Sequence, residues 1–296
     1  MNNIKKAYLE LHVAVLLFGF TAILGDLIQL SAVMIVWWRV LITCISLLYF
    51  IQFGIKLRSI PRDKIFKFLG IGVLVALHWI TFYGAIKLSN ASVALICFAS
   101  TSLFTSFLEP AILGRPIEKL QVMMGLMIIP GMCLIVNTVN PAMLNGIYIG
   151  LLSALLAAIF STLNKRLIDD ADSYSITFLE LGSAWIFISL LVPVLIWNGK
   201  EIQFWPVGTD WTYLLILALL CTTLAYILSL RALKYVSAFV ANLTINLEPV
   251  YGILLAVILL NDHKELSPRF YVGVVLISAI VFSYPLIKKR MKKSIK

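Results

Sequence analysis

Residues 235–261 read YVSAFVANLTINLEPVYGILLAVILLN, an apolar stretch interrupted by one acid, Glu248, and the proline that follows it. The stretch is long enough to cross a bilayer, since a membrane helix needs about 20 residues. A carboxylate inside the membrane costs about 2.5–3.5 kcal/mol on insertion scales, so Glu248 is expected to face protein or a wet cavity. The stretch therefore predicts a membrane helix with a functional acid at mid-depth.

A helical wheel divides this stretch into two faces. The face that carries Glu248 is otherwise small and polar: Ser237, Ala241, Thr244 and Gly252. The opposite face is expected to contact lipid: Phe239, Leu243, Leu247, Val250, Leu254 and Val257.

Pro249 adds a second reason to place a site here. Because proline has no backbone donor, a carbonyl one turn earlier is left free. Asn242, Thr244 and Asn246 lie close to that carbonyl in the sequence. We expect these three polar side chains to bind substrate together with Glu248.

The composition of the whole chain is that of an integral membrane protein. Of 296 residues, 61% are hydrophobic and 13% charged, and the mean hydropathy is +0.99, far from the balance of soluble domains. Membrane spans are predicted at about 9–28, 34–53, 65–86, 91–113, 119–137, 145–166, 174–197, 211–230, 237–260 and 267–287. A signal peptide is the competing interpretation of the first run, which is long and lacks a small-residue cleavage site. We predict an all-α protein with ten transmembrane helices.

Lysine and arginine gather on one side when these spans alternate across the membrane. Of the 24 basic residues, only Arg39, Lys87, Lys200, Lys264 and Arg269 are assigned to the other side. The positive-inside rule then places both termini in the cytoplasm of a multi-pass inner-membrane protein. This asymmetry also accounts for the net charge of +10. Membrane lipid is the expected partner of the basic C-terminal tail, and nucleic acid is not.

The residues that commonly hold metals form no pattern. Cys44, Cys97, Cys133 and Cys221 all lie in apolar runs without a paired-cysteine motif, and the three histidines are scattered. We predict neither a metal site nor a disulfide framework, and we expect no cofactor.

The chain contains an internal repeat. Residues 85–94, AIKLSNASVA, align without a gap to residues 232–241, ALKYVSAFVA, and one inserted residue later Gly125 aligns with Gly273. Five spans per copy force the second copy to enter from the opposite side of the membrane. We therefore predict two inverted five-helix repeats, residues 1–143 and 144–296, within one transmembrane domain. Chance similarity between helices rich in alanine and valine is the alternative.

These segments resemble the drug/metabolite transporter superfamily and its ten-helix EamA-type members. The resemblance covers nearly the whole chain and is carried by residues 232–238, by Leu247-Glu248-Pro249-Val250 and by the weaker copy from Ala85. It implies a secondary transporter that exports or exchanges a small metabolite, such as an amino acid or related compound, through a central cavity by alternating access. Family members often carry Glu after the fourth and ninth spans, where this chain has Arg115 and Asp262.

Three acids are candidates for coupling transport to an ion. Thr101 occupies the repeat position that corresponds to Glu248, so only one half carries the mid-depth acid, which favours a function for it. Glu248 is expected to bind a cationic group of the substrate or to take up a proton. Glu180 lies about two turns inside its span and is expected to pair with a basic group. Glu109 lies near the cytoplasmic end of its span, where it can reach water.

Further substrate-binding candidates place aromatic faces and polar tips at membrane depth, which suits an amphipathic organic substrate: His78, Trp79, Tyr83 and Tyr226, together with Thr101. A packing role is the commoner one for a lone membrane histidine, and interfacial belts are the common alternative for the aromatic residues. Trp37 and Trp38 are expected to form such a belt beside Arg39.

The alternative to a transporter is an intramembrane enzyme that uses magnesium and acts on a lipid diphosphate. Its best feature is the acidic run at residues 169–172, DDAD. A second acidic run, a zinc-protease motif, a phosphate-binding loop and a Gly-x-Ser-x-Gly motif are all missing from the sequence. We interpret the run as a solvated turn before Ser173 caps the next helix and predict no enzyme. The expected partners are a small-molecule substrate and lipid, and a homodimer is left open.

Overall fold

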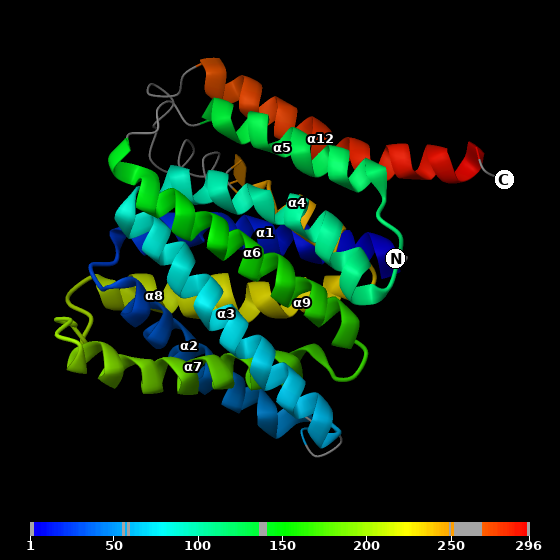
Figure 1. Cartoon of the computed structure of the whole chain (residues 1–296). Helices are drawn as coiled ribbons and strands as arrows, with labels where there is room; N and C mark the ends of the chain where they lie inside the picture. The colour runs from blue at the N-terminus through cyan, green and yellow to red at the C-terminus, as the bar shows by residue number, and fades with distance from the viewer. Residues whose placement is uncertain are drawn as a thin grey trace.

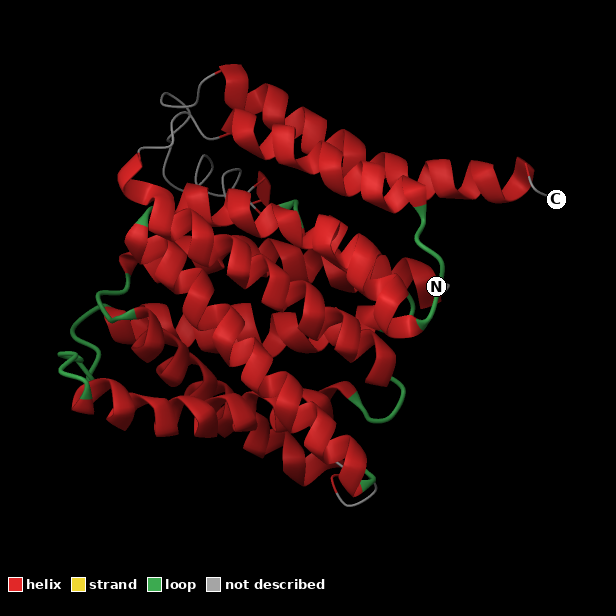
Figure 2. Ribbon diagram, viewed as in Figure 1, coloured by secondary structure: helices red, strands yellow, loops and turns green. Residues whose placement is uncertain are grey.

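The computed structural model describes residues 3–54, 57, 60–135, 141–248, 250–251 and 268–294. Every regular element in these ranges is helical, as Figure 2 shows, which confirms the all-α prediction for them. The elements are α1 (Asn3–Leu27), α2 (Ala32–Gly54), α3 (Arg62–Leu88), α4 (Ala91–Leu113), α5 (Lys119–Ile135), the 3-10 turn η2 (Pro141–Met143), α6 (Leu144–Leu167), α7 (Ser173–Trp197), α8 (Asp210–Ala218), the π-helical η3 (Leu219–Leu224), α9 (Ala225–Leu233), α10 (Ala238–Ile245) and α12 (Pro268–Ser294).

Seven helical stretches in the described chain are long and apolar enough to cross a membrane. They are α1, α2, α3, α4, α6, α7 and the continuous run α8–η3–α9, and α5 is a shorter apolar helix. Of the predicted span 237–260, the structure describes α10 and a few residues after it. Pro249, Gly252, Leu254, Val257 and Asp262 lie outside the described residues.

The helices form one bundle in which distant segments of the chain interleave (Figure 1). Helix α6 packs against both α3 and α4, α7 packs against α2 and α3, and α1 packs against α9. Helices α5 and α12 lie side by side at one edge of the bundle, and α1 begins on the side where α12 ends.

Small residues explain the close approach of α6 to its neighbours. Gly146, Gly150, Ser153 and Ala157 are all buried at helical spacing on α6. A β carbon at Gly150 would lie 2.7 Å from the β carbon of Cys97 on α4, so glycine is required at that crossing. These small residues therefore have an architectural role in the bundle.

Helices α4 and α10 begin at corresponding positions of the predicted repeat. Asn90 precedes α4, and its side chain accepts a hydrogen bond from the backbone of Val93 at 2.8 Å. Ser237 precedes α10 and accepts from the backbone of Val240 at 3.2 Å. Side-chain caps of this kind satisfy backbone donors that a helix start leaves unpaired, and they fix where both helices begin.

Six of the eight residues of helix α10 are buried. Phe239 and Leu243, which were expected to contact lipid, are buried, as are Leu247 and Val250 just beyond the helix. The prediction of a lipid face is therefore wrong for the described residues. The reason is that α4, α6, α1 and α9 surround α10, and the ring of Phe239 also packs on Tyr284 of α12 at 5.2 Å.

Trp37 and Trp38 are held by contacts within the protein, and their place in an interfacial belt stays a prediction. The indole of Trp37 donates to Ser189 on α7 at 2.9 Å, and the indole of Trp38 donates to the carbonyl of Phe204 at 2.8 Å. Their rings join an aromatic cluster with Trp185 and Phe204. This cluster fastens α2 to α7 and to the connection that follows it.

Candidate functional site

A cavity lies among α1, α2, α3, α4, α6, α9 and α10. The volume open to the centres of water molecules is about 90 Å³. One water needs about 10–15 Å³ of such volume, so the cavity has room for several waters. More than half of its lining residues are aromatic or aliphatic: Phe18, Trp79, Phe82, Phe98, Ala157, Phe160, Tyr226, Leu230, Leu233, Ala241 and Ile245. The polar part comprises Thr21, Arg39, His78, Ser161, Asn164, Ser229, Asn242 and Glu248.

The structure brings some of the predicted site residues together in this wall and leaves others out. Those that line the cavity are Glu248, Asn242, His78, Trp79 and Tyr226. The remaining candidates are buried but do not line it: Tyr83, Thr101, Thr244, Asn246, Glu180 and Glu109.

Glu248 follows α10 and is only 4% exposed. Its carboxylate makes no hydrogen bond and no ion pair with any of the residues that the structure describes. It therefore presents a buried acid to the cavity, as the cost of placing this group in lipid required.

Arg39 belongs to the cavity wall but was not among the predicted site residues. It was assigned to the side opposite the termini, but it lies within α2 at 1% exposure. Its Nη1 donates to the hydroxyl of Tyr83 at 2.8 Å, and the guanidinium carbon lies 4.0 Å from the centroid of the Trp79 ring. Arg39 is close enough to Glu248 for their charges to interact. The missed signal was its position inside the predicted span 34–53.

A π-helical turn provides the remaining contacts of Arg39. In η3, helical bonding shifts from the fourth to the fifth residue, which changes the partners of nearby carbonyls. Arg39 donates through Nε to the Thr222 hydroxyl at 2.5 Å and through Nη2 to the Cys221 carbonyl at 3.3 Å. Thr43 donates to the Ala218 carbonyl at 3.1 Å. The turn thus fixes the guanidinium beside the cavity.

The polar residues of α10 tie it to its neighbours. The Asn242 amide donates to the hydroxyls of Thr105 on α4 and Ser161 on α6, at 2.7 and 2.8 Å. Asn246 donates to Ser102 at 3.1 Å, and the Thr244 hydroxyl donates to a carbonyl of its own helix. Of the predicted trio, only Asn242 lines the cavity, while Asn246 and Thr244 lie off its wall; substrate binding by these residues stays a prediction.

His78 is held firmly in the wall. Its Nδ1 lies 2.8 Å from the hydroxyl of Ser153, and its ring stacks on Phe98 with centroids 5.4 Å apart. Ser153 also donates to the His78 carbonyl at 3.0 Å. These contacts favour the packing role for this histidine.

Thr101, the repeat counterpart of Glu248, makes a purely local contact. Its hydroxyl donates to the carbonyl of Phe98 one turn earlier in α4, at 2.6 Å. The side chain is buried and lies off the cavity wall, so it does not reproduce the position of Glu248 there.

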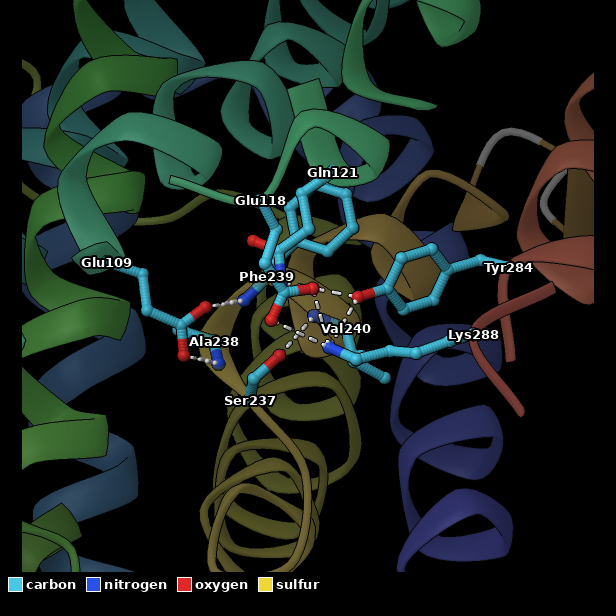
Figure 3. A network of polar contacts seen from close by, with 9 residues as sticks. All are labelled: Glu109, Glu118, Gln121, Ser237, Ala238, Phe239, Val240, Tyr284 and Lys288. Atoms are coloured by element: carbon cyan, nitrogen blue, oxygen red, sulfur yellow. Dashed lines mark hydrogen bonds and ion pairs between the residues drawn. The ribbon is translucent and has the colours of Figure 1, made fainter. Parts of the chain in front are cut away.

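Glu109 caps a helix, and the prediction that it reaches water is wrong. Its two carboxylate oxygens accept from the backbone N–H groups of Ala238 and Phe239, at 3.0 and 2.9 Å, and it is 4% exposed (Figure 3). A negative charge at a helix start satisfies unpaired donors and the helix dipole together. On the other side of the same turn, Lys165 donates to the Leu233 carbonyl at 2.7 Å.

A second polar contact in Figure 3 joins α12 to the chain just before α5. Lys288 lies 2.9 Å from a carboxylate oxygen of Glu118 and 3.1 Å from the hydroxyl of Tyr284. Tyr284 in turn accepts from the amide of Gln121 at 3.2 Å. These bonds hold the outer pair of helices together.

A model of the EamA-like transporter family matches residues 5–137 and again residues 144–284. The chain belongs to the EamA-like transporter family. It is a multi-pass membrane transporter of the drug/metabolite type. A crystal structure of another protein has the same fold, with a TM-score of 0.77 over 97% of this chain and 99% of that one, at 17% identity. No curated protein matches the sequence.

Glu180 occupies the interior of the EamA-like transporter, on α7, and is fully buried. Its Oε2 accepts from the hydroxyl of Tyr226 at 2.6 Å and from the amide of Asn164 at 3.2 Å. No basic side chain of the described residues pairs with it, so the prediction of a basic partner is wrong there. The acid is instead linked to two residues of the cavity wall.

The acidic run of the EamA-like transporter, residues 169–172, has structural partners. Asp170 pairs with Lys64 at 2.8 Å, and Asp172 accepts from the backbone of Tyr174 and Ser175 at 3.0 Å each. Asp172 rather than Ser173 is therefore the cap of α7, because its carboxylate reaches the first free backbone donors.

Proposed function

We propose that this EamA-like transporter carries a small organic metabolite with both a cationic and an anionic group, such as an amino acid or a related compound. It would do so across the inner, or plasma, membrane as an exporter or exchanger, by alternating access. The observation that supports this proposal is the presence of Arg39 and Glu248 in the wall of one cavity.

The two charged groups suit the two ends of such a substrate. A guanidinium has five N–H donors, and the contacts described for Arg39 use three of them, which leaves donors for a carboxylate. Glu248 has no described partner and can accept from an ammonium group. The aromatic part of the wall offers an apolar surface to the rest of the substrate. Without substrate, the opposite charges of Arg39 and Glu248 stabilise each other.

We also propose that the membrane domain comprises ten helices in two inverted repeats, residues 1–143 and 144–296, with both termini in the cytoplasm. The equivalent starts of α4 and α10 support the repeat. The common side on which α1 begins and α12 ends supports an even number of crossings (Figure 1).

A metabolite-efflux screen that compares cells with and without the protein tests the function and identifies the substrate. Vesicles with the wild type, Glu248→Gln and Thr101→Val then test the site. Glu248→Gln keeps the shape but cannot ionise, so transport should be lost or its pH dependence flattened. Thr101→Val, the control at the repeat position, should transport normally. Wild-type rates and pH profile in Glu248→Gln would overturn the assignment of Glu248.

An intramembrane enzyme is the alternative function, and nothing in the described structure favours it. The carboxylates of Asp170 and Asp172 are engaged by Lys64 and by the start of α7. Magnesium-dependent turnover of a prenyl diphosphate that is abolished by Asp169→Ala would reverse this ranking.

A further inference from the structure

The carboxyl group of Glu180 is incompletely satisfied. Both described bonds, from Tyr226 and Asn164, reach the same oxygen, Oε2. The other oxygen, Oε1, is buried and has no hydrogen-bond partner. The Oδ1 atom of Asn164 is also buried without a partner. Two acceptor oxygens on contacting side chains therefore both lack a donor, which is a costly arrangement in an apolar interior.

The charge of this carboxyl group is also unbalanced. The titratable side chains in the interior of the neighbouring helices are Arg39 and Cys44 on α2, His78 and Tyr83 on α3, Lys165 on α6 and Tyr226 on α9. Of these, only Tyr226 forms a hydrogen bond with Glu180, and no charged side chain of the described residues forms an ion pair with it. An isolated carboxylate in such surroundings must be neutralised by a bound proton or cation.

We propose that Glu180 is a proton-binding site of this transporter, separate from Glu248, and that it carries its proton on Oε1. One proton there neutralises the charge and turns Oε1 into a donor. The same donor can serve the unpaired Oδ1 of Asn164, while Oε2 remains the carbonyl that accepts from Tyr226. A single proton thus neutralises the buried charge and gives both unpaired oxygens, Oε1 of Glu180 and Oδ1 of Asn164, a hydrogen-bond partner.

The acid is linked to the cavity. Asn164 and Tyr226 line the cavity, and both contact Glu180, so they connect the acid with water in the cavity. A hydronium ion in the cavity would give its proton to the carboxylate and become water, and release would reverse this step. The coupling of this proton to transport rests on the proposed function, but proton binding itself does not.

Infrared spectroscopy of the purified protein without substrate tests the proton site. We expect the wild type to show the carbonyl band of a protonated carboxylic acid, lost on raising the pH. Glu180→Gln should lose this band and take up one proton fewer per molecule, whereas Glu248→Gln should retain it. Tyr226→Phe, which removes a donor to Oε2, should move the band to higher frequency. The melting temperature of each variant establishes that it is folded.

Three results would overturn the proposal. The first is a Glu180→Gln spectrum that keeps all the carboxylic acid bands of the wild type. The second is a Tyr226→Phe spectrum in which no band moves. A band that appears only when sodium is removed would instead assign a cation to the site. If Glu180→Gln does not fold, the Tyr226→Phe spectrum decides alone.

Vesicles loaded with the metabolite identified by the efflux screen test the coupling. Glu180→Gln should exchange this metabolite at equal pH on both sides but should no longer accumulate it when a pH gradient is applied. Accumulation at the wild-type level would overturn the coupling role. If the screen finds no transported metabolite, the proposed function fails, while the infrared result on the proton site stands.

Discussion

Replacing Glu109 separates a structural role from a role in ion coupling. Its two oxygens hold the first two backbone donors of α10, and a hydrogen bond to a charged group contributes about 1.5–3 kcal/mol. Glu109→Ala removes both bonds at a buried position, so we expect a loss of about 3–6 kcal/mol in the free energy of unfolding. Glu109→Gln keeps one acceptor and should lose roughly half of that.

Ser237 offers a matched control at the same helix start. It caps α10 through one neutral hydrogen bond, so Ser237→Ala should cost only about 1 kcal/mol. Thermal unfolding in detergent, followed by tryptophan fluorescence, should therefore rank the melting temperatures as wild type, Ser237→Ala, Glu109→Gln and Glu109→Ala, from highest to lowest.

Two results would refute the reasoning for Glu109. One is a melting temperature for Glu109→Ala no lower than that of Ser237→Ala, since the double backbone contact would then contribute nothing. The other is Glu109→Gln protein of wild-type stability that no longer transports, because that would return Glu109 to the coupling candidates.

Three further predictions concern the site, the packing and the topology. Arg39→Lys keeps the charge but cannot reproduce the three hydrogen bonds of the guanidinium in their fixed directions. The transport rate in vesicles should therefore fall about tenfold or more, which corresponds to about 1.4 kcal/mol, and a wild-type rate would contradict this. Gly150→Ala should lower the melting temperature because its methyl group meets α4, whereas Gly182→Ala, with open space around it, should not; equal effects would contradict the packing argument. Reporter tags at Met1 and Lys296 should both report cytoplasm and a tag within 198–210 the outer side, and an outside C-terminus would exclude the inverted repeat.

The helices and the interior position of Glu248 could be predicted from the sequence because both follow from local physics. An apolar run of span length forms a helix in a membrane, and an acid within it must avoid lipid. The starts of α4 and α10 were equally local, since Asn90 and Ser237 cap the helices that directly follow them.

The partners of Arg39 and Glu109 could not be predicted because they lie far away in the chain. Glu109 caps a helix that starts at Ala238, and Arg39 reaches Thr222. The count of basic residues on each side of the membrane included Arg39, although it lies inside the predicted span 34–53 and is buried in α2. A helical wheel cannot distinguish a lipid face from a face buried under other helices, because both are apolar, and this produced the error for α10.

The π-helical turn at Leu219–Leu224 makes chain length itself a determinant of the site. It accommodates one residue more than an α-helical turn, so deleting a residue there would let α8 and α9 join as one regular helix. Because the π-helical turn absorbs the extra residue, the helices on its two sides would keep their relative orientation, and only the bonding within the turn would change. Tyr226 would keep its place in the cavity wall, whereas the Cys221 carbonyl would be redirected and Arg39 would lose it as a partner. In this family, a one-residue gap at this turn in a sequence comparison therefore indicates a changed set of carbonyl contacts for the arginine at position 39, even where the flanking residues are identical.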